Sequence, residues 1–300
     1  MNFTGQHVDD KLVVRLLADI KQKKELRTLS GNFVRGQLLL FLERNPKVLR
    51  YLLEQPSSRA EKYKQLIKEL RKNLRRTYGV FQLDKEIKER QQLVEELVTK
   101  NPKNGKNLVE RILATHASTK ERLLFYEELY RKIFLMTGKP QRVLDLGSGL
   151  NPFSIPLMHL RKLDFSAYDI SDEEVNTLTD FFAFLQRQNK HFSGHAETLD
   201  LFHWEQLKKL KKADVCFLFK MTDVLDRGKG HKATESVLRE VPARFVVISF
   251  PTKTLSGKRM NFPKRRWIEL LCNRLGFSFR VLQFPNEVFY VIEKKSESEE

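Results

Sequence analysis

The stretch of sequence that indicates the fold is Val143-Leu144-Asp145-Leu146-Gly147-Ser148-Gly149, an apolar run that ends in two closely spaced glycines. A short apolar run of this kind is typical of a buried strand, and the glycines let the backbone turn tightly without a Cβ clash. In open α/β sheets, ligands bind at the carboxyl ends of the strands. The sequence therefore predicts a ligand site around Asp145, Gly147 and Gly149.

Similar runs on either side extend the pattern. Strand-like segments at 142–146, 164–168, 213–218, 244–249 and 287–292 alternate with helical segments, and a helix is predicted over 108–136. Strands and helices that alternate in this way indicate a largely parallel sheet with helices on both faces. The predicted fold class is therefore α/β, of the doubly wound type.

The segment before this pattern contains helical signals only. Within it, Tyr63, Leu66, Ile67, Leu70 and Leu74 follow the spacing of an amphipathic helix. Polar breakers divide the segment, and the last of them, at 101–105, is the predicted domain boundary. We expect an all-helical domain over 1–104, an α/β domain over 105–295 and a polar tail over 296–300.

The chain is strongly basic, with 55 Lys and Arg against 38 Asp and Glu and a formal net charge of +17. The excess is concentrated in residues 1–104, which hold 23 Lys and Arg against 13 Asp and Glu. A charge of this size and placement is typical of nucleic-acid binding, although solvated lysine faces would also produce it.

Hydropathy and cysteine usage narrow the class of protein further. No apolar run reaches the length of a membrane span, and charges stand where a signal peptide would be apolar, so we expect a cytoplasmic protein without membrane contact. The two cysteines, Cys216 and Cys272, lie in apolar or helical stretches that favour core positions. We therefore predict no disulfide and no metal site.

Two further carboxylates follow predicted strand positions. Asp169 comes 20 residues after Gly149, where a carboxylate can accept both hydroxyls of a ribose, or can cap the following helix. Asp200, next to Leu201, can accept from an adenine amino group or lie in an exposed loop. The third glycine of a dinucleotide site is replaced by Pro152, which disfavours a nicotinamide oxidoreductase.

Four motifs occur in a fixed order along the chain: His116-Ala117-Ser118-Thr119-Lys120-Glu121-Arg122, Asp145-Leu146-Gly147-Ser148-Gly149-Leu150-Asn151-Pro152, Phe250-Pro251-Thr252-Lys253 and Glu287-Val288-Phe289-Tyr290-Val291-Ile292. Together they resemble the aminoglycoside-resistance 16S rRNA guanine-N7 methyltransferases over about residues 108–295. The chain departs from this family at Ser148, where Cys is frequent, and at Thr222-Asp223, in a turn that is otherwise apolar.

The resemblance implies a Rossmann-like methyltransferase fold, S-adenosylmethionine as cofactor and a decoding-region guanine of the small ribosomal subunit as target. Arg122 would pair with the methionine carboxylate, for which a guanidinium fork is suited, Asp169 would hold the ribose, and Asp200 with Leu201 the adenine. The expected cofactor site is completed by His116, Asp145, Gly147, Gly149 and Lys220. Without the resemblance, Arg122 would be interpreted as a solvated residue paired with Glu121 or Glu127.

Two basic segments are the expected RNA contacts. The first lies in the helical domain and includes Lys72, Arg75 and Arg76. The second contains no acidic residue and includes Lys253, Lys258, Arg259, Lys264, Arg265 and Arg266. Phe262 and Trp267 add aromatic faces to the second segment, which suits phosphate neutralisation combined with base stacking. Each segment could also be a solvated surface.

The implied reaction needs no general base, because guanine N7 keeps a free lone pair at neutral pH, and no catalytic residue is assigned. Positioning of the reactants supplies most of the acceleration, with the base extruded and stacked on aromatic side chains. We expect a monomer that acts on 16S rRNA in the small ribosomal subunit. The alternatives are a methyltransferase for another rRNA site or for tRNA, and a non-catalytic RNA-binding ribosome factor.

Overall fold

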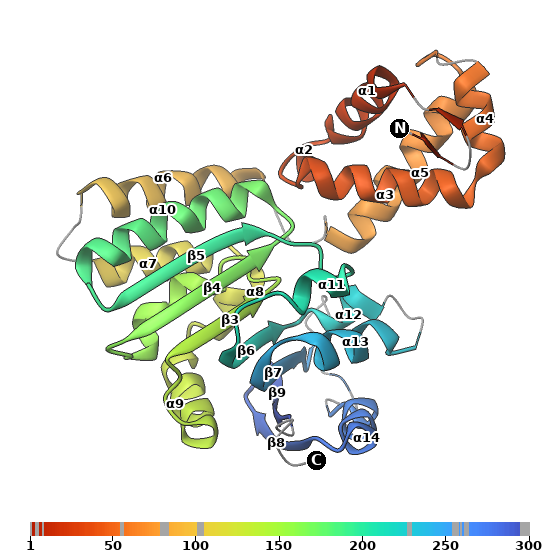
Figure 1. The fold of residues 1–300 in the computed structure, drawn as a ribbon. Coiled ribbons are helices and arrows are strands. Elements are labelled where there is room, and N and C mark those ends of the chain that lie inside the picture. The colour runs from red at the N-terminus through yellow and green to blue at the C-terminus, as the bar shows by residue number, and fades with distance from the viewer. Residues whose placement is uncertain are drawn as a thin grey trace. The chain divides into compact units, whose positions relative to one another are not determined.

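A computed structural model describes residues 2–3, 6–7, 9–54, 57–78, 84–100, 105–226, 230–253, 258, 260 and 264–294, without the side chains of 2–3, 6–7, 76–78 and 84–87. The chain forms two compact units (Figure 1). The first, called the helical unit, contains residues 1–85 and 170–173, and the second, called the α/β unit, contains residues 86–169 and 174–300. Among the described residues, no helix combines the length and the apolarity needed to cross a membrane.

The helical unit is built around one apolar core. Its elements are β1 (Asn2–Phe3), β2 (Gln6–His7), α1 (Asp10–Lys21), α2 (Lys24–Arg27), α3 (Gly31–Arg44), α4 (Pro46–Glu54) and α5 (Glu61–Tyr78). The apolar stripe predicted for 63–74 lies on α5, and each of its five members is buried. The stripe therefore holds α5 in the unit, and its lysines and arginines occupy the remaining faces.

The α/β unit contains a seven-stranded sheet in the order β5-β4-β3-β6-β7-β9-β8. The strands are β3 (Arg142–Leu146), β4 (Leu163–Asp169), β5 (Phe192–Thr198), β6 (Ala213–Phe219), β7 (Ala243–Pro251), β8 (Ser278–Gln283) and β9 (Glu287–Glu293). The first five in the order are parallel, and β9 pairs antiparallel with both β7 and β8. Starting from β3, the chain first adds β4 and β5 on one side and then adds β6 and β7 on the other side. This change of side between β3 and β6 makes their carboxyl ends the topological switch point, where ligands bind.

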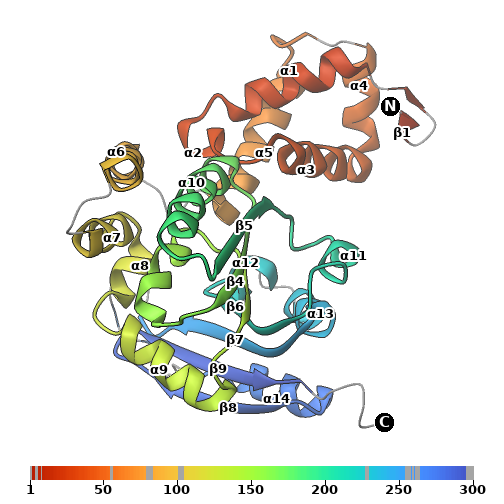
Figure 2. The same cartoon turned by 60° about the vertical axis from the view of Figure 1, so that its left-hand side comes forward.

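Helices cover both faces of the sheet (Figure 2). One face packs against α6 (Asp84–Lys100), α7 (Gly105–Ala114), α9 (Tyr126–Thr137), the 3-10 helix η1 (Asn151–Met158) and α10 (Asp172–Gln188), with the short α8 (Ala117–Arg122) beside them. The other packs against α11 (Trp204–Leu207), α12 (Thr222–Asp226), α13 (Lys232–Glu240) and α14 (Arg266–Leu275). Neighbouring residues of β3 divide between the faces: Val143 joins the first core, and Leu144 joins the second. Helices on both faces confirm the doubly wound α/β prediction.

The helix predicted over 108–136 is wrong as a single element, because the chain leaves helical geometry at two places. Thr115 donates its hydroxyl to the carbonyl of Ile112, and His116 is extended, with φ −129° and ψ 131°. Phe125, with φ −140°, separates α8 from α9. Side-chain hydrogen bonds to the backbone compete with helical ones, so this short polar stretch ends α7 without a proline or glycine.

The division between the units falls at Lys85–Glu86, earlier than the boundary predicted after residue 104. The reason is the apolar face of α6. Leu93, Val94 and Leu97 are buried in the same core cluster as Leu108 of α7, so α6 belongs with the α/β unit. Both cysteines, Cys216 and Cys272, are free thiols and are buried, in agreement with the predicted core positions.

Candidate active site

The glycine turn after β3 has a backbone that only glycine adopts readily. Gly147 has φ +66° and Gly149 has φ +47°. A Cβ on Gly147 would lie 2.4 Å from the sulfur of Met221, whereas a Cβ on Gly149 would meet nothing within 4 Å. The backbone N–H of Gly147 donates to the carbonyl of Tyr168 at 2.8 Å. The turn is therefore fixed to β4 and presents an open backbone surface at Gly149.

Asp169 lies at the end of β4 and is tied to this turn. Its Oδ2 accepts the backbone N–H of Gly149 at 2.9 Å, and its carbonyl accepts the N–H of Leu199 at 2.9 Å. The carboxyl ends of β3, β4 and β5 therefore meet at Asp169, a half-buried residue whose carboxylate bonds to the turn after β3 and whose backbone carbonyl bonds to the residue after β5. This is the position at which a ribose-binding carboxylate is found in sheets of this type.

Asp200 and Leu201 follow β5. Oδ1 of Asp200 accepts the backbone N–H of Phe202 at 3.0 Å, and the side chain is 13% exposed. Leu201 is buried among the residues of the second core. The structure therefore shows Asp200 as the acceptor of a local turn, on the same edge as Asp169, and leaves its role towards an adenine a prediction.

Asp145 is buried at the end of β3. Its Oδ2 accepts from Nδ2 of Asn151 at 2.8 Å, and the hydroxyl of Tyr126 donates to Oδ1 of Asn151 at 3.0 Å. Burial raises the pKa of Asp145 to about 7, and nearby Asp169 adds to the rise, although Asn151 and Arg122 oppose it. Asp145 thus lies behind the glycine turn as a carboxyl group that titrates near neutral pH.

Arg122 is buried and pairs with Glu287. Its Nε donates to Oε2 at 2.9 Å and its Nη2 donates to Oε1 at 2.8 Å, so both bonds of the guanidinium fork go to one protein carboxylate. Neither Glu121 nor Glu127, the partners considered from sequence, fills this place. In the sequence, Glu287 is visible only as the first residue of the strand motif Glu287–Ile292. The available signal was a charged residue next to a fully apolar run, Val288–Ile292, where a buried carboxylate needs a cation.

Lys220 follows β6 directly and adopts a left-handed backbone, with φ 57°. Its N–H donates to the carbonyl of Ser249 at 3.2 Å and to the hydroxyl of Ser249 at 3.0 Å, which holds this conformation. Its Nζ lies 2.5 Å from Oε2 of Glu121 and 3.7 Å from Oε2 of Glu287. A non-glycine residue in this region is strained, and such strain is concentrated at functional sites.

His116 stands at the N-terminus of α8, the helix that carries Glu121 and Arg122. Burial, together with the nearby cations Arg90, Arg122 and Lys220, lowers its pKa to about 4. The imidazole is therefore neutral at pH 7. The structure thus brings His116, Arg122, Lys220 and Glu287 into one charged cluster, and Asp145, Gly149 and Asp169 into a second cluster beside β3 and β4.

Some of the predicted RNA-contacting side chains already contact other protein groups, and others are exposed to solvent. In the helical unit, Nε of Arg75 lies 2.5 Å from Oε1 of Glu25, whereas Lys72 is exposed. In the second segment, Arg265 lies over the ring of Phe250 at 5.5 Å, and Lys258, Lys264 and Arg266 are exposed, with Lys253 half-buried. Arg259 and the side chain of Arg76 lie outside the described residues.

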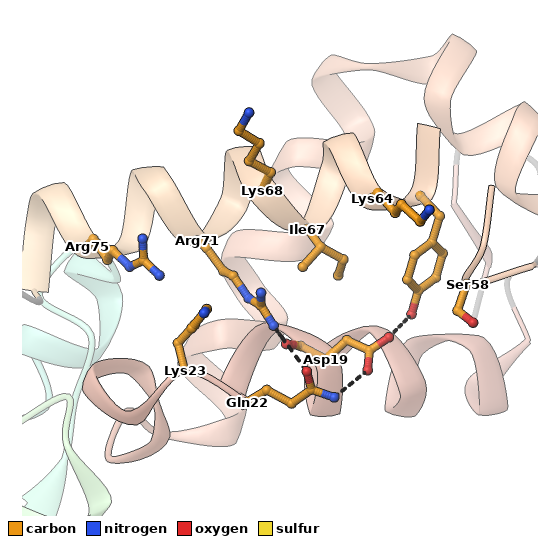
Figure 3. Close-up of a pocket in the computed structure, with 10 residues that line it drawn as sticks. Asp19, Gln22, Lys23, Ser58, Lys64, Ile67, Lys68, Arg71 and Arg75 are labelled. Carbon is orange, nitrogen blue, oxygen red and sulfur yellow. Dashed lines mark hydrogen bonds between the residues drawn. The ribbon is translucent and has the colours of Figure 1, made fainter. Parts of the chain in front are cut away.

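A hollow of about 420 Å³ in the helical unit gathers further positive charge (Figure 3). It is lined by Lys23, Lys64, Lys68, Arg71 and Arg75, and by one acidic residue, Asp19. Asp19 accepts from the hydroxyl of Tyr63 at 2.6 Å and from Nε2 of Gln22 at 3.1 Å. Arg71 donates to the carbonyls of Asp19 and Ile20. The arginines and the aspartate therefore hold α5 against α1 and α2, and the lysines give the hollow its net positive charge.

Comparison with known proteins gives one family over most of the chain. Residues 42–291 match the family model described as ribosomal RNA methyltransferase (FmrO). A 16S rRNA (guanine(1405)-N(7))-methyltransferase of Proteus mirabilis is 26% identical over 246 residues, which cover 77% of this chain and 85% of that enzyme. The enzyme of the same name from Micromonospora rosea is 30% identical over 191 residues, which cover 61% of this chain and 65% of that enzyme.

Solved structures show the same fold. The 16S rRNA methyltransferase RmtF, crystallised with S-adenosyl-L-homocysteine, superposes with a TM-score of 0.73 over 96% of this chain and 100% of that chain, at 24% identity. The 16S rRNA methylase RmtB superposes with a TM-score of 0.66 over 94% of this chain and 98% of that chain, at 22% identity. At these identities the likeness is evidence for the fold.

Proposed function

Because this chain belongs to the ribosomal RNA methyltransferase (FmrO) family, we propose that it transfers a methyl group from S-adenosylmethionine to guanine N7 of 16S rRNA in the decoding region of the small ribosomal subunit. The observation that carries the proposal is the match to enzymes named for this reaction over as much as 77% of the chain. The carboxyl edge of the sheet supports it independently, because its charged groups are those that such a cofactor requires.

The residues at this edge fit the proposed cofactor. Gly149 faces open space, and Asp169 is fixed beside it as an acceptor for ribose hydroxyls. Arg122 and Lys220 are the cations of the site, and Glu287 and Glu121 are the carboxylates next to them. We propose that His116, Arg122, Asp145, Gly147, Gly149, Asp169, Asp200, Leu201 and Lys220 hold the cofactor. For Arg122, direct contact with the cofactor carboxylate requires that it share or exchange a bond now made to Glu287.

The chain's part in the chemistry is to bind and orient. When bound, S-adenosylmethionine supplies an electrophilic methyl group on a sulfonium. The neutral His116 and the paired charges of Arg122 and Glu287 add no net charge to the site, so a cationic sulfonium is not opposed there. Guanine N7 needs no proton removed before it reacts. Accurate placement of the base is therefore the main demand on the protein.

The proposed partner is 16S rRNA within the small subunit, and we propose that the chain acts on it as a monomer in the cytoplasm. The exposed cations of both segments predicted from sequence, with the lysines of the hollow in the helical unit, supply positive charge for phosphate contacts. Because phosphate contacts position a protein without reading bases, the helical unit serves affinity and the α/β unit serves the choice of nucleotide.

Mass spectrometry of 16S rRNA from cells with and without this protein tests the proposal. We expect one additional methyl group on a single guanosine of the decoding region when the protein is present. A methyl group found only on another rRNA site or on tRNA would replace the proposed target while keeping the reaction. No added methyl group on any RNA, from a protein that is folded and expressed, would contradict the enzymatic function.

A further inference from the structure

Three aromatic side chains form a column that runs from the core to the surface beside the carboxyl end of β7. Phe250 of β7 is buried and meets Trp267 of α14 edge to face, with ring centroids 5.7 Å apart. The imidazole of His231 lies flat on the indole of Trp267, with centroids 3.6 Å apart and 6° between the planes. The side chain of His231 is 46% exposed, so the column ends in a ring that solvent reaches.

The orientation of this ring is fixed from a second direction. Nδ1 of His231 lies 3.2 Å from Oδ2 of Asp226. Asp226 is buried and accepts the backbone N–H of Thr234 at 3.0 Å and the hydroxyl of Thr234 at 2.8 Å. Trp267 therefore holds the face of the imidazole and Asp226 holds its edge. A planar group fixed in this way loses little conformational freedom when another ring stacks on it.

The column belongs to the same edge of the sheet as the candidate cofactor site. Asp226 ends α12, which begins directly after Lys220 and Met221, and Met221 packs against Gly147. The segment before Trp267 is held to the sheet as well, because the backbone N–H of Arg265 donates to the hydroxyl of Tyr290 in β9 at 2.9 Å. Two segments that follow the carboxyl ends of β6 and β7 thus supply His231 and Trp267.

We propose that the exposed face of His231 is a stacking platform for an unpaired base of the RNA substrate, an inference that rests on the function proposed above. Stacking on a fixed ring suits any base, because every base has a π-face. Lys232, Lys264 and Arg266, which are close to the platform residues in sequence, are exposed and can neutralise phosphates of the bound strand. The platform contributes affinity for an unstacked strand and helps to keep it open beside the cofactor site.

The test compares five versions of the full chain, the wild type and four variants, on purified small ribosomal subunits. His231→Ala removes the ring, His231→Leu keeps an apolar cover on Trp267 without a planar face, and His231→Phe keeps a planar face without the Asp226 contact. We expect the Ala and Leu variants to bind subunits about tenfold more weakly and the Phe variant to bind close to wild type. The affinity for S-adenosylmethionine and the melting temperature of the Leu variant are expected to stay unchanged. His191→Ala, at another exposed histidine, is the matched control and should bind subunits normally.

Two results would overturn the platform. One is a Leu variant that binds subunits as tightly as wild type, and the other is a Phe variant as weak as the Leu variant, since a planar ring would then have no special role. Failure of the proposed function looks different. In that case the wild-type protein itself transfers no methyl group to the subunits, and the inference falls with the function on which it rests.

Discussion

A buried arginine needs an anion beside it, and Glu287 supplies one to Arg122 through two hydrogen bonds of 2.8 and 2.9 Å. Glu287→Gln leaves the guanidinium without its main countercharge. We expect the free energy of unfolding to fall by about 3–5 kcal/mol, the range for breaking a buried ion pair. Urea unfolding of the purified variant measures this loss.

The paired substitution Arg122→Met with Glu287→Leu separates stability from binding. An apolar pair of similar volume should recover most of the lost stability. It should still bind S-adenosylmethionine at least about tenfold more weakly, because the charged hydrogen bonds proposed for Arg122 are gone. A stable double variant with unchanged cofactor affinity would assign the pair a purely structural role.

Asp145 gives the chain a pH dependence that opposes the usual behaviour of a carboxylate. Its pKa is raised to about 7 by burial, whereas an unfolded aspartate ionises near pH 4. Between these values the folded state binds more protons, so this residue lowers stability as pH rises to about 7, and its effect is constant above that. Below pH 4 the effect disappears.

Asp145→Asn keeps an acceptor for Asn151 and removes the titration. The free energy of unfolding of the variant, relative to that of wild type, should therefore increase by on the order of 2 kcal/mol as the pH rises from 5 to 8. The difference between the two proteins cancels the opposite contribution of His116, whose lowered pKa favours stability at higher pH. A difference that does not change with pH would show that Asp145 ionises normally in the folded chain.

At the scale of elements, the ion pair between Arg90 and Glu174 fastens α6 to α10. Nη2 of Arg90 lies 3.3 Å from Oε1 of Glu174, and both side chains are 3% exposed. Arg90→Met should cost about 3–5 kcal/mol, because it leaves a buried carboxylate without its cation. Lys100→Met is the matched control on the same helix. Its pair with Glu96 is exposed, so we expect a loss below about 1 kcal/mol. Thermal unfolding that ranks the two variants equally would contradict the anchoring role.

Elements were predictable where one short segment determines them. The strand at 142–146 was predicted with the bounds that β3 has, because apolar residues followed by Gly-x-Gly have few other solutions. β8 was missed, since Ser278–Gln283 alternates without a strong apolar run and depends on pairing with β9. The breaks at His116 and Phe125 were missed because local hydrogen bonds, with no proline or glycine, end those helices.

The same distinction applies to the site. Asp145, Gly149 and Asp169 were predictable because the end of a strand in a parallel sheet fixes where they lie, and the structure joins Asp169 to Gly149. Glu287 was assigned no role, because its partner Arg122 is 165 residues away in the sequence and only the fold brings them together. Trp267 was predictable as an aromatic face beside the second basic segment, but its stacking with His231 was not, since nothing in the sequence shows that the two rings are parallel.

At the scale of the whole molecule, the helical unit is expected to supply salt-dependent affinity. Lys23, Lys64 and Lys68 line its hollow, and each phosphate contact should contribute about one to the slope of log affinity against log salt. Replacing all three with Gln should lower that slope by up to about three and leave the melting temperature and cofactor affinity unchanged. Arg71→Gln is the control, because Arg71 bonds to backbone carbonyls and should instead lower the melting temperature. An unchanged slope in the stable triple variant would remove the hollow from the RNA-binding surface.

The most direct test of the account is methyl transfer by the purified protein to isolated small ribosomal subunits, followed by chemical cleavage of the rRNA at N7-methylguanosine. We predict a single new cleavage site at a guanosine of the decoding region, which depends on S-adenosylmethionine and is lost with Asp169→Ala. No new cleavage with folded wild-type protein and S-adenosylmethionine, or methylation found at an atom other than guanine N7, would contradict the account.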